Sequence, residues 1–156
     1  MGDVALRGRA EPIAVRGPRP LAQGTALKAT ASRSTGLTHQ LSARHHSLTV
    51  DEPAEKGGND AGPSPSELLA LSLASCTSIT IHMYADRKGW EVGDVKVDVD
   101  YELESQEGWA RFDLTIYLPK ALSDEQVEKI IVIAGRCPIH RVLLGEIEIA
   151  ERVERV

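Results

Sequence analysis

The chain lacks the hydrophobic patterns that take proteins into or across membranes. No window contains the roughly 18 uninterrupted apolar residues that a transmembrane helix needs. The N-terminus has no basic region followed by an apolar core, so no secretory signal is evident. We therefore expect a cytoplasmic protein with no membrane partner.

Cysteine is scarce, since Cys76 and Cys137 are the only two in the sequence. In a reducing cytoplasm, two cysteines are a poor basis for a structural disulfide. The two thiols are therefore expected to be buried bystanders, metal ligands or a redox pair.

Basic residues are outnumbered, with 18 lysines and arginines against 23 acidic residues and a net charge of -5. Binding to nucleic-acid phosphates needs a basic surface, so no nucleic-acid partner is expected. Aromatic residues are also few, at 4%, but 42% apolar and 26% charged residues are ordinary for a globular protein. A length of 156 residues is enough for one domain with a sizeable core.

The chain is organised around residues 57–90, which begin as a loop rich in glycine and proline and continue as an apolar segment. Ser64, Pro65 and Glu67 mark a helix start, with serine as the N-cap, proline in the first turn and glutamate closing a capping box. The apolar residues that follow leave little polar face, and Cys76 lies among them. A helix that is apolar nearly all round is normally enclosed by other elements. We therefore predict a buried central helix of roughly 20 to 24 residues, about 30–36 Å long.

Alternating patterns predict strands on both sides of this helix. Residues 25–33 and 37–50 read as two strands joined by a hairpin loop that contains Gly36. Residues 95–104 and 112–118 alternate apolar with polar or charged residues, as half-buried strands do. A glycine-containing turn joins this second pair, which is therefore expected to be an antiparallel hairpin.

The last third of the chain predicts two more helices and a strand. Ser123 and Gln126 repeat the capping-box spacing, and Gly135 marks the C-cap of that helix. The buried stripe of the helix is expected to consist of Val127, Ile130, Ile131 and Ala134. A short helix then covers residues 137–144, and a strand covers residues 146–153.

This order of elements is typical of an α+β fold with mostly antiparallel pairing, because few helices cross between adjacent strands. We expect a single domain over residues 25–156. Before it, residues 1–24 carry four arginines and three prolines without a sustained period. That composition predicts an irregular arm, or one that becomes ordered against a partner subunit.

The two cysteines have different local settings. Cys76 lies about three turns inside the central helix, beyond the first turn in which the helix dipole acts. In isolation it would be a buried, neutral thiol. Cys137 precedes Pro138 at a helix start, where free backbone amides and the dipole favour a thiolate. Local electrostatics therefore favour Cys137 as the readier thiolate.

Two motifs carry a resemblance to a known family. The pattern GGxxxGPSPxELLxxSLxxCTxxT begins at Gly57 and is followed by YAxxKGW, and RCPIHRVL begins at Arg136. Together they resemble the OsmC/Ohr family of osmotically inducible and organic-hydroperoxide-resistance proteins, and most closely its OsmC-like subgroup. The resemblance covers residues 37–150. It implies an OsmC-like fold, with antiparallel sheets packed around the central helix, and an intertwined homodimer.

The resemblance also implies an activity connected with the stress response. Family members are thiol peroxidases that reduce organic hydroperoxides to alcohols, at two active sites on the subunit interface. By motif match, Cys76 would attack the peroxide and Cys137 would resolve the sulfenic acid as a disulfide. The implied partners are a second copy of the chain, a small organic hydroperoxide and an external dithiol reductant. The alternative is a non-catalytic OsmC-like protein that binds an apolar or thiol-bearing small molecule and leaves its cysteines unactivated.

The family activates its attacking thiol with an arginine–glutamate pair, and this sequence departs from it at both positions. Ser66 stands at the position of the glutamate. Glu67 is the nearby candidate, but at 100° per residue it points roughly 180° away from Cys76. Residues 48–50, at the matching strand position, contain no arginine. The candidates to replace it are Arg33, Arg44 and Arg136.

Two histidines are further candidates for the site. His45 and His46 must point to opposite faces if both lie on a strand. His46 is the preferred pocket residue, because it begins an H-x-L-x-x-D-E-P pattern that resembles the OsmC-like subgroup. Cys137 and His140 have metal-ligand spacing, but Pro138 at the helix start and the family pattern disfavour a metal. We expect no metal and no other cofactor, and His140 stays a candidate pocket residue.

Overall fold

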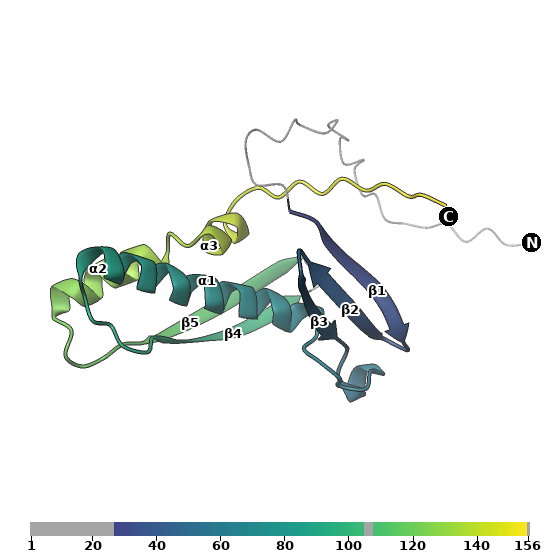
Figure 1. The fold of residues 1–156 in the computed structure, drawn as a ribbon, viewed down its shortest axis with the longest axis horizontal. Coiled ribbons are helices and arrows are strands. Elements are labelled where there is room, and N and C mark those ends of the chain that lie inside the picture. The colour runs from purple at the N-terminus through teal and green to yellow at the C-terminus, as the bar shows by residue number, and fades with distance from the viewer. Residues whose placement is uncertain (1–26, 105–107, 156) are drawn as a thin grey trace, which may run out of the picture. The chain divides into compact units, whose positions relative to one another are not determined.

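The computed structural model describes residues 27–104 and 108–155, so the predicted arm over residues 1–24 lies outside the described part of the chain. Leu27–Ile147 form one compact unit, to which the described residues that follow do not belong. The elements labelled in Figure 1, together with the short 3-10 helix η1, are β1 (Ala29–Thr35), β2 (Thr38–Ala43), β3 (His46–Val50), η1 (Ala54–Lys56), α1 (Pro65–Lys88), β4 (Lys96–Glu104), β5 (Trp109–Tyr117), α2 (Asp124–Ala134) and α3 (Pro138–Leu143). Both sheets are antiparallel, as predicted for an α+β fold.

The first sheet has three strands in the order β1-β2-β3. The prediction of one strand over residues 37–50 is wrong, because the chain turns at Arg44 and His45 and pairs β3 back onto β2. Arg44 adopts a φ of 56°, in the left-handed region that turns usually fill with glycine or asparagine. Because neither residue is present there, the sequence gives no turn signal at this point.

A buried carboxylate organises the loop between β3 and α1. Asp51 accepts hydrogen bonds from the hydroxyl of Thr38 (2.8 Å) and from the backbone N–H groups of Glu52 (2.9 Å), Asn59 (3.0 Å) and Ala61 (3.4 Å). Burial alone would raise the pKa of Asp51, but these four hydrogen bonds bring it below its ordinary value. The loop is therefore tied to the first sheet by one ionised side chain.

Two glycines allow this loop to fold tightly. A Cβ atom on Gly58 would lie 1.7 Å from the carbonyl oxygen of Glu52, and one on Gly62 would lie 2.3 Å from that of Thr49. Any larger residue at either position would collide with the backbone. The second and third glycines of the GGxxxG pattern are therefore a packing requirement of the loop that leads into α1.

Helix α1 begins and ends as the sequence predicts. The N–H of Ser64 donates to the Glu67 carboxylate (2.6 Å), and the N–H of Glu67 donates to the Ser64 hydroxyl (3.3 Å). These two bonds complete the capping box. After 24 residues, Gly89 ends the helix in the left-handed conformation.

The single chain buries one stripe of α1 rather than its whole circumference. The buried residues follow helical spacing and are Ala70, Leu73, Thr77, Ile81 and Ala85. The C-terminal part of this stripe, Ile81 and Ala85, packs in the core with Val92, Val95 and residues of α2. Strand β4 and helices α2 and α3 pack against α1, and Figure 1 shows the helix alongside the β4–β5 hairpin.

Other apolar side chains of α1 are exposed in the single chain. We call Leu71, Ile79 and Met83 the open face of α1; their exposed fractions are 54%, 57% and 58%. The expectation of a helix enclosed on all sides is therefore not met by one copy of the chain. The length and hydropathy of α1 would also fit a membrane span, but its buried stripe belongs to the core.

The second sheet is the predicted hairpin of β4 and β5. The strands pair from Lys96 opposite Tyr117 to Glu104 opposite Trp109, so β5 begins three residues earlier than predicted. Val95 is buried and Val97 is half-buried, as expected for the inner face of the first strand.

Helix α2 carries the predicted capping box of Ser123 and Gln126. Of its predicted stripe, Ile130 and Ala134 are buried, but Ile131 is 61% exposed. Ile131 lies 100° around the helix from Ile130, beyond the edge of the face that contacts the core.

The strand predicted over residues 146–153 is absent from the structure, which shows no regular element there. Ile149, for example, is 81% exposed. The alternating sequence is that of a strand, but a strand needs a neighbouring backbone with which to pair, and residues 146–153 pair with none of the described strands.

Candidate active site

Folding brings the two cysteines close together. Cys76 lies in the middle of α1, and Cys137 is the N-cap of α3, which packs against α1. Both are free thiols, and Cys137 is one of the groups that raise the pKa of Cys76. The two thiols are therefore neighbours within one chain.

The sulfur of Cys137 is fully buried and accepts two hydrogen bonds. The backbone N–H of His140 donates to it at 3.2 Å, and the hydroxyl of Thr77 donates to it at 3.7 Å. The predicted position of Cys137 at a helix start is confirmed, since its side chain caps the first turn of α3. Its sulfur is therefore held in place by two hydrogen-bond donors.

Cys76 is only half-buried, so its sulfur is the more accessible of the two. Burial raises the pKa of the Cys76 thiol, and the hydrogen bond to Cys137 and the charge of that neighbour raise it further. Hydrogen bonds from the backbone N–H of Ile139 and the side chain of Thr80 act in the opposite direction without cancelling these effects. In the single chain, Cys76 is therefore a thiol at neutral pH.

The raised pKa predicts slow alkylation of Cys76 at neutral pH. Its reaction with iodoacetamide should accelerate only above the ordinary thiol range, because the thiolate is the nucleophile. The pKa of Cys76 is higher in the folded chain than in the unfolded chain, so the protonated thiol favours the fold at pH values below the unfolded-state pKa. That contribution is lost as the pH rises through the folded-state pKa. Peptide mass spectrometry from about pH 6 to about pH 10 measures the alkylation; a midpoint below the ordinary thiol value would contradict the prediction.

Glu67 lies away from the two sulfurs. Its carboxylate is engaged in the capping box, and the backbone and side-chain hydrogen bonds from Ser64 lower its pKa. It lines a groove of about 790 Å³ whose lining includes neither cysteine. Glu67 is therefore a helix-capping residue in this chain.

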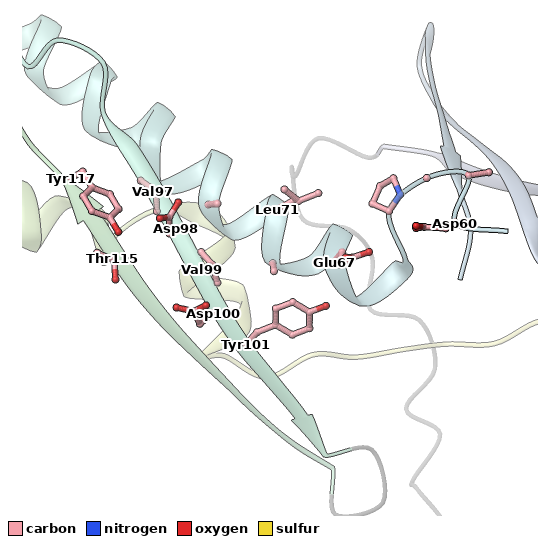
Figure 2. A pocket seen from close by; sticks show the side chains of 15 residues that line it. Asp60, Glu67, Leu71, Val97, Asp98, Val99, Asp100, Tyr101, Thr115 and Tyr117 are labelled. Carbon is pink, nitrogen blue, oxygen red and sulfur yellow. The ribbon is translucent and has the colours of Figure 1, made fainter. Parts of the chain in front are cut away.

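The groove lies between the first half of α1 and the β4–β5 hairpin. Figure 2 shows Glu67 and Leu71 on its helix side and Asp98, Asp100 and Tyr101 on its strand side. The groove is open, and acidic and apolar side chains both line it. It is separate from the pocket that the sequence predicts beside the thiols.

The candidate histidines have different surroundings. His140 lies in the turn that binds Cys137, and its Nδ1 is buried without a hydrogen-bond partner among the described residues. His46 is exposed on β3. The prediction that His45 and His46 point to opposite faces is wrong, because His45 lies in the turn and the two ring centroids are 4.0 Å apart.

The candidate arginines contact neither sulfur in the described part of the chain. Arg136 is exposed and lines a shallow hollow with residues of α2. Arg33 donates to the carbonyl oxygen of Gly36 at 2.8 Å, and Arg44 lies in the β2–β3 turn. Within residues 27–104 and 108–155, no group of three or more histidine, cysteine, aspartate or glutamate side chains could hold a metal ion.

Sequence reasoning missed two hydroxyl residues of the site. Thr77 binds the sulfur of Cys137, and Thr80 binds that of Cys76. The signal was present in the CTxxT motif, because Thr80 follows Cys76 by four residues and so shares its face of the helix. The contact of Thr77 with Cys137 depends on the packing of α3 and has no local signal.

Comparisons with known proteins identify the family of the chain. The family model described as OsmC-like protein matches residues 57–152. An uncharacterized protein from Haloferax volcanii is 26% identical over 92 residues, which is 58% of this chain and 70% of that protein.

Two solved structures show the same fold. An OsmC-like protein from Mycoplasma pneumoniae has a TM-score of 0.67 and 20% identity, over 77% of this chain and 88% of that one. An organic hydroperoxide resistance protein from Elizabethkingia anophelis has a TM-score of 0.60 and 22% identity, over 79% of this chain and 91% of that one.

Proposed function

Because the chain belongs to the OsmC-like protein family, we propose that it is a thiol peroxidase that reduces organic hydroperoxides with Cys76 and Cys137. The observation that carries the proposal is the packing of α3 against α1, which brings the sulfur of Cys137 within 3.7 Å of the hydroxyl of Thr77, the residue next to Cys76. Cys76 is assigned the attack because its sulfur is the accessible one, whereas that of Cys137 is fully buried. The name of the similar Elizabethkingia protein, an organic hydroperoxide resistance protein, supports the substrate class.

In the proposed reaction, the Cys76 thiolate attacks the distal oxygen of the hydroperoxide. A sulfur–oxygen bond forms, the oxygen–oxygen bond breaks, and the leaving alkoxide takes a proton to become the alcohol. The sulfur of Cys137 then displaces water from the Cys76 sulfenic acid, and a disulfide forms. An external dithiol in the cytoplasm would reduce the disulfide and restore both thiols.

Mass spectrometry of the intact protein tests this proposal. After one equivalent of an organic hydroperoxide, the wild-type chain should lose two hydrogens, and digestion should locate the new disulfide between Cys76 and Cys137. The Cys137→Ser variant should instead accumulate a sulfenic acid on Cys76, which dimedone traps. An unchanged wild-type mass, with the hydroperoxide intact, would exclude the activity.

We extend the proposal to a homodimer, in which a second copy covers the open face of α1. Exposed apolar residues on one helix are typical of a surface that another subunit buries. Met83→Asp should therefore convert a dimer to a monomer in sedimentation experiments, because it places a charge on that face. Lys120→Asp introduces the same side chain at an exposed position in the loop between β5 and α2 and should leave the dimer intact. A wild-type monomer at all concentrations would disprove the dimer.

One observation favours a second function. The raised pKa of Cys76 suits a non-catalytic protein that holds an apolar or thiol-bearing small molecule and leaves its own thiols unactivated. Such a protein would bind the molecule without a change in its own mass. The hydroperoxide experiment therefore separates the two functions.

A further inference from the structure

Strand β4 has a free edge. It pairs with β5 on one side, and its sheet contains no further strand among the described residues. Five consecutive residues of β4, 97–101, line the groove beside α1 (Figure 2). Because neighbours in a strand point to opposite faces, a groove lined by a consecutive run passes along the edge of the strand itself. The groove therefore gives access to the edge of β4 that β5 leaves unpaired, and such an edge can accept another extended segment.

Negative charge is not balanced on one face of β4, the face that carries Asp98 and Asp100. Asp98 forms an ion pair with Lys96 at 2.7 Å. Asp100 lies directly opposite Asp113 in the hairpin, and like charges in that position repel. The neighbouring cation, Arg111, binds Asp113 at 2.8 Å. This face of β4 is therefore suited to a neighbouring strand that carries cationic side chains.

The other face of β4 is apolar. Val97, Val99 and Tyr101 lie on it and are half-buried. Leu71 of α1 lines the same groove and is 54% exposed. A segment that fits this edge therefore needs cationic side chains two residues apart on one face and apolar side chains on the other.

The sequence VALRGRA, residues 4–10, has this pattern and lies outside the described part of the chain. In an extended conformation, Arg7 and Arg9 share one face, and Leu6 lies on the other with further small or apolar residues. The spacing of the two arginines equals that of the two aspartates on β4. No proline interrupts the segment, so each of its residues can donate a backbone hydrogen bond to a neighbouring strand.

Two other segments fit the edge of β4 less well. Residues 146–153 alternate as a strand does, but Glu146 and Glu148 would add negative charge to an acidic face. Strand β1 is exposed along its whole length, but Arg33 is its single basic residue, so it lacks a pair of cations. Charge and spacing therefore favour residues 4–10.

We propose that residues 4–10 of a second copy pair with β4 as an added strand, with Arg7 and Arg9 beside Asp98 and Asp100. Backbone hydrogen bonds along the edge supply affinity in this arrangement. The two arginine–aspartate pairs fix the register, because a slip by one residue would turn both arginines to the apolar face.

The second copy is the source because the groove is continuous with the open face of α1. Leu71 belongs to both surfaces, so a subunit that covers the open face also lies beside the edge of β4. The inference thus rests on the homodimer proposed above. Residues 11–26 connect the added strand to the described part of its own chain, and when extended they span roughly 50 Å, enough to cross from one subunit to the other.

Amide hydrogen exchange of the full-length protein, measured in peptides that cover β4, tests the added strand. In the wild type, β4 should exchange slowly. Arg7→Glu/Arg9→Glu should raise its exchange rate about tenfold and weaken the dimer about tenfold in sedimentation experiments, because two attractive cross-strand pairs become repulsive. Arg16→Glu/Arg19→Glu makes the same change of charge nearby in the sequence but outside the added strand, and should leave β4 unchanged. The same effect from both variants, or none from either, would overturn the proposal.

Mixing two variants shows which copy supplies the strand. Asp98→Lys/Asp100→Lys and Arg7→Glu/Arg9→Glu are each mismatched as homodimers, because like charges meet in both. In a mixed dimer, the introduced glutamates meet the introduced lysines, and the remaining arginines meet the remaining aspartates. The mixture should therefore form mixed dimers about tenfold more readily than either homodimer in native mass spectrometry, and β4 should regain its slow exchange. A mixture that behaves as the sum of its two components would overturn the assignment to a second copy.

These measurements use no hydroperoxide, so they separate the added strand from the proposed activity. A protein that shows the expected exchange and mixing but leaves a hydroperoxide intact would disprove the peroxidase and support the added strand. A protein that reduces the hydroperoxide while β4 exchanges equally fast in the wild type and in Arg7→Glu/Arg9→Glu would overturn the added strand alone. A wild-type monomer would overturn the added strand together with the dimer.

Discussion

Replacement of Cys76 by serine is expected to abolish hydroperoxide reduction, with a loss of about 10³-fold or more, since the nucleophile of a covalent mechanism has no substitute. Serine is almost isosteric with cysteine, and Cys76 is half-buried rather than part of the core, so the fold should persist. The loss is therefore chemical rather than structural. A coupled assay of hydroperoxide consumption, with dithiothreitol as the reductant, measures it.

The control for this variant lies on the same helix. Lys88→Ala changes an exposed position at the C-terminal end of α1 and should keep the wild-type rate. Circular dichroism of both variants checks that α1 is unchanged. Consumption of hydroperoxide by Cys76→Ser at the wild-type rate would show that the attack does not occur at Cys76.

Replacement of Ile81 by alanine is expected to lower the free energy of unfolding by about 2–5 kcal/mol, as large-to-small substitutions in packed cores do. Ile81 is fully buried where α1 meets α2 and the segment before β4, so its loss leaves a cavity that the neighbouring helix closes only in part. Urea unfolding followed by circular dichroism measures the change.

Ile79 on the same helix provides the matched comparison. It is 57% exposed in one chain, so Ile79→Ala should affect stability mainly through the dimer, and the effect should depend on protein concentration. The Ile81→Ala effect should remain at concentrations that keep the dimer intact. Equal and concentration-independent losses for the two variants would show that the open face of α1 is buried within one chain.

Local sequence determined the helices and the second sheet. The capping boxes at Ser64 and Ser123 gave the starts of α1 and α2 correctly, because a cap is a hydrogen bond between residues three apart in the chain. The β4–β5 hairpin was equally predictable from its alternating residues. The turn at Arg44 was missed, because there a left-handed backbone is held by strand pairing rather than by a turn-forming residue.

The burial of side chains could not be read from their hydrophobicity alone. Ile130 and Ile131 are adjacent and equally apolar, yet one is buried and the other exposed, because a single chain covers one face of α2. The same holds for the alternating residues 146–153, whose pattern specifies a strand but not the backbone with which it would pair.

The sequence by itself determined the family, the three α-helices, the β4–β5 hairpin and the two cysteines as the chemical groups of interest, because each of these follows from local patterns and motifs. Only the tertiary structure decided that the two cysteines are neighbours and that Thr77 donates to Cys137. These contacts join residues far apart in the chain. They exist because α3 packs against the middle of α1, and no local pattern records that packing.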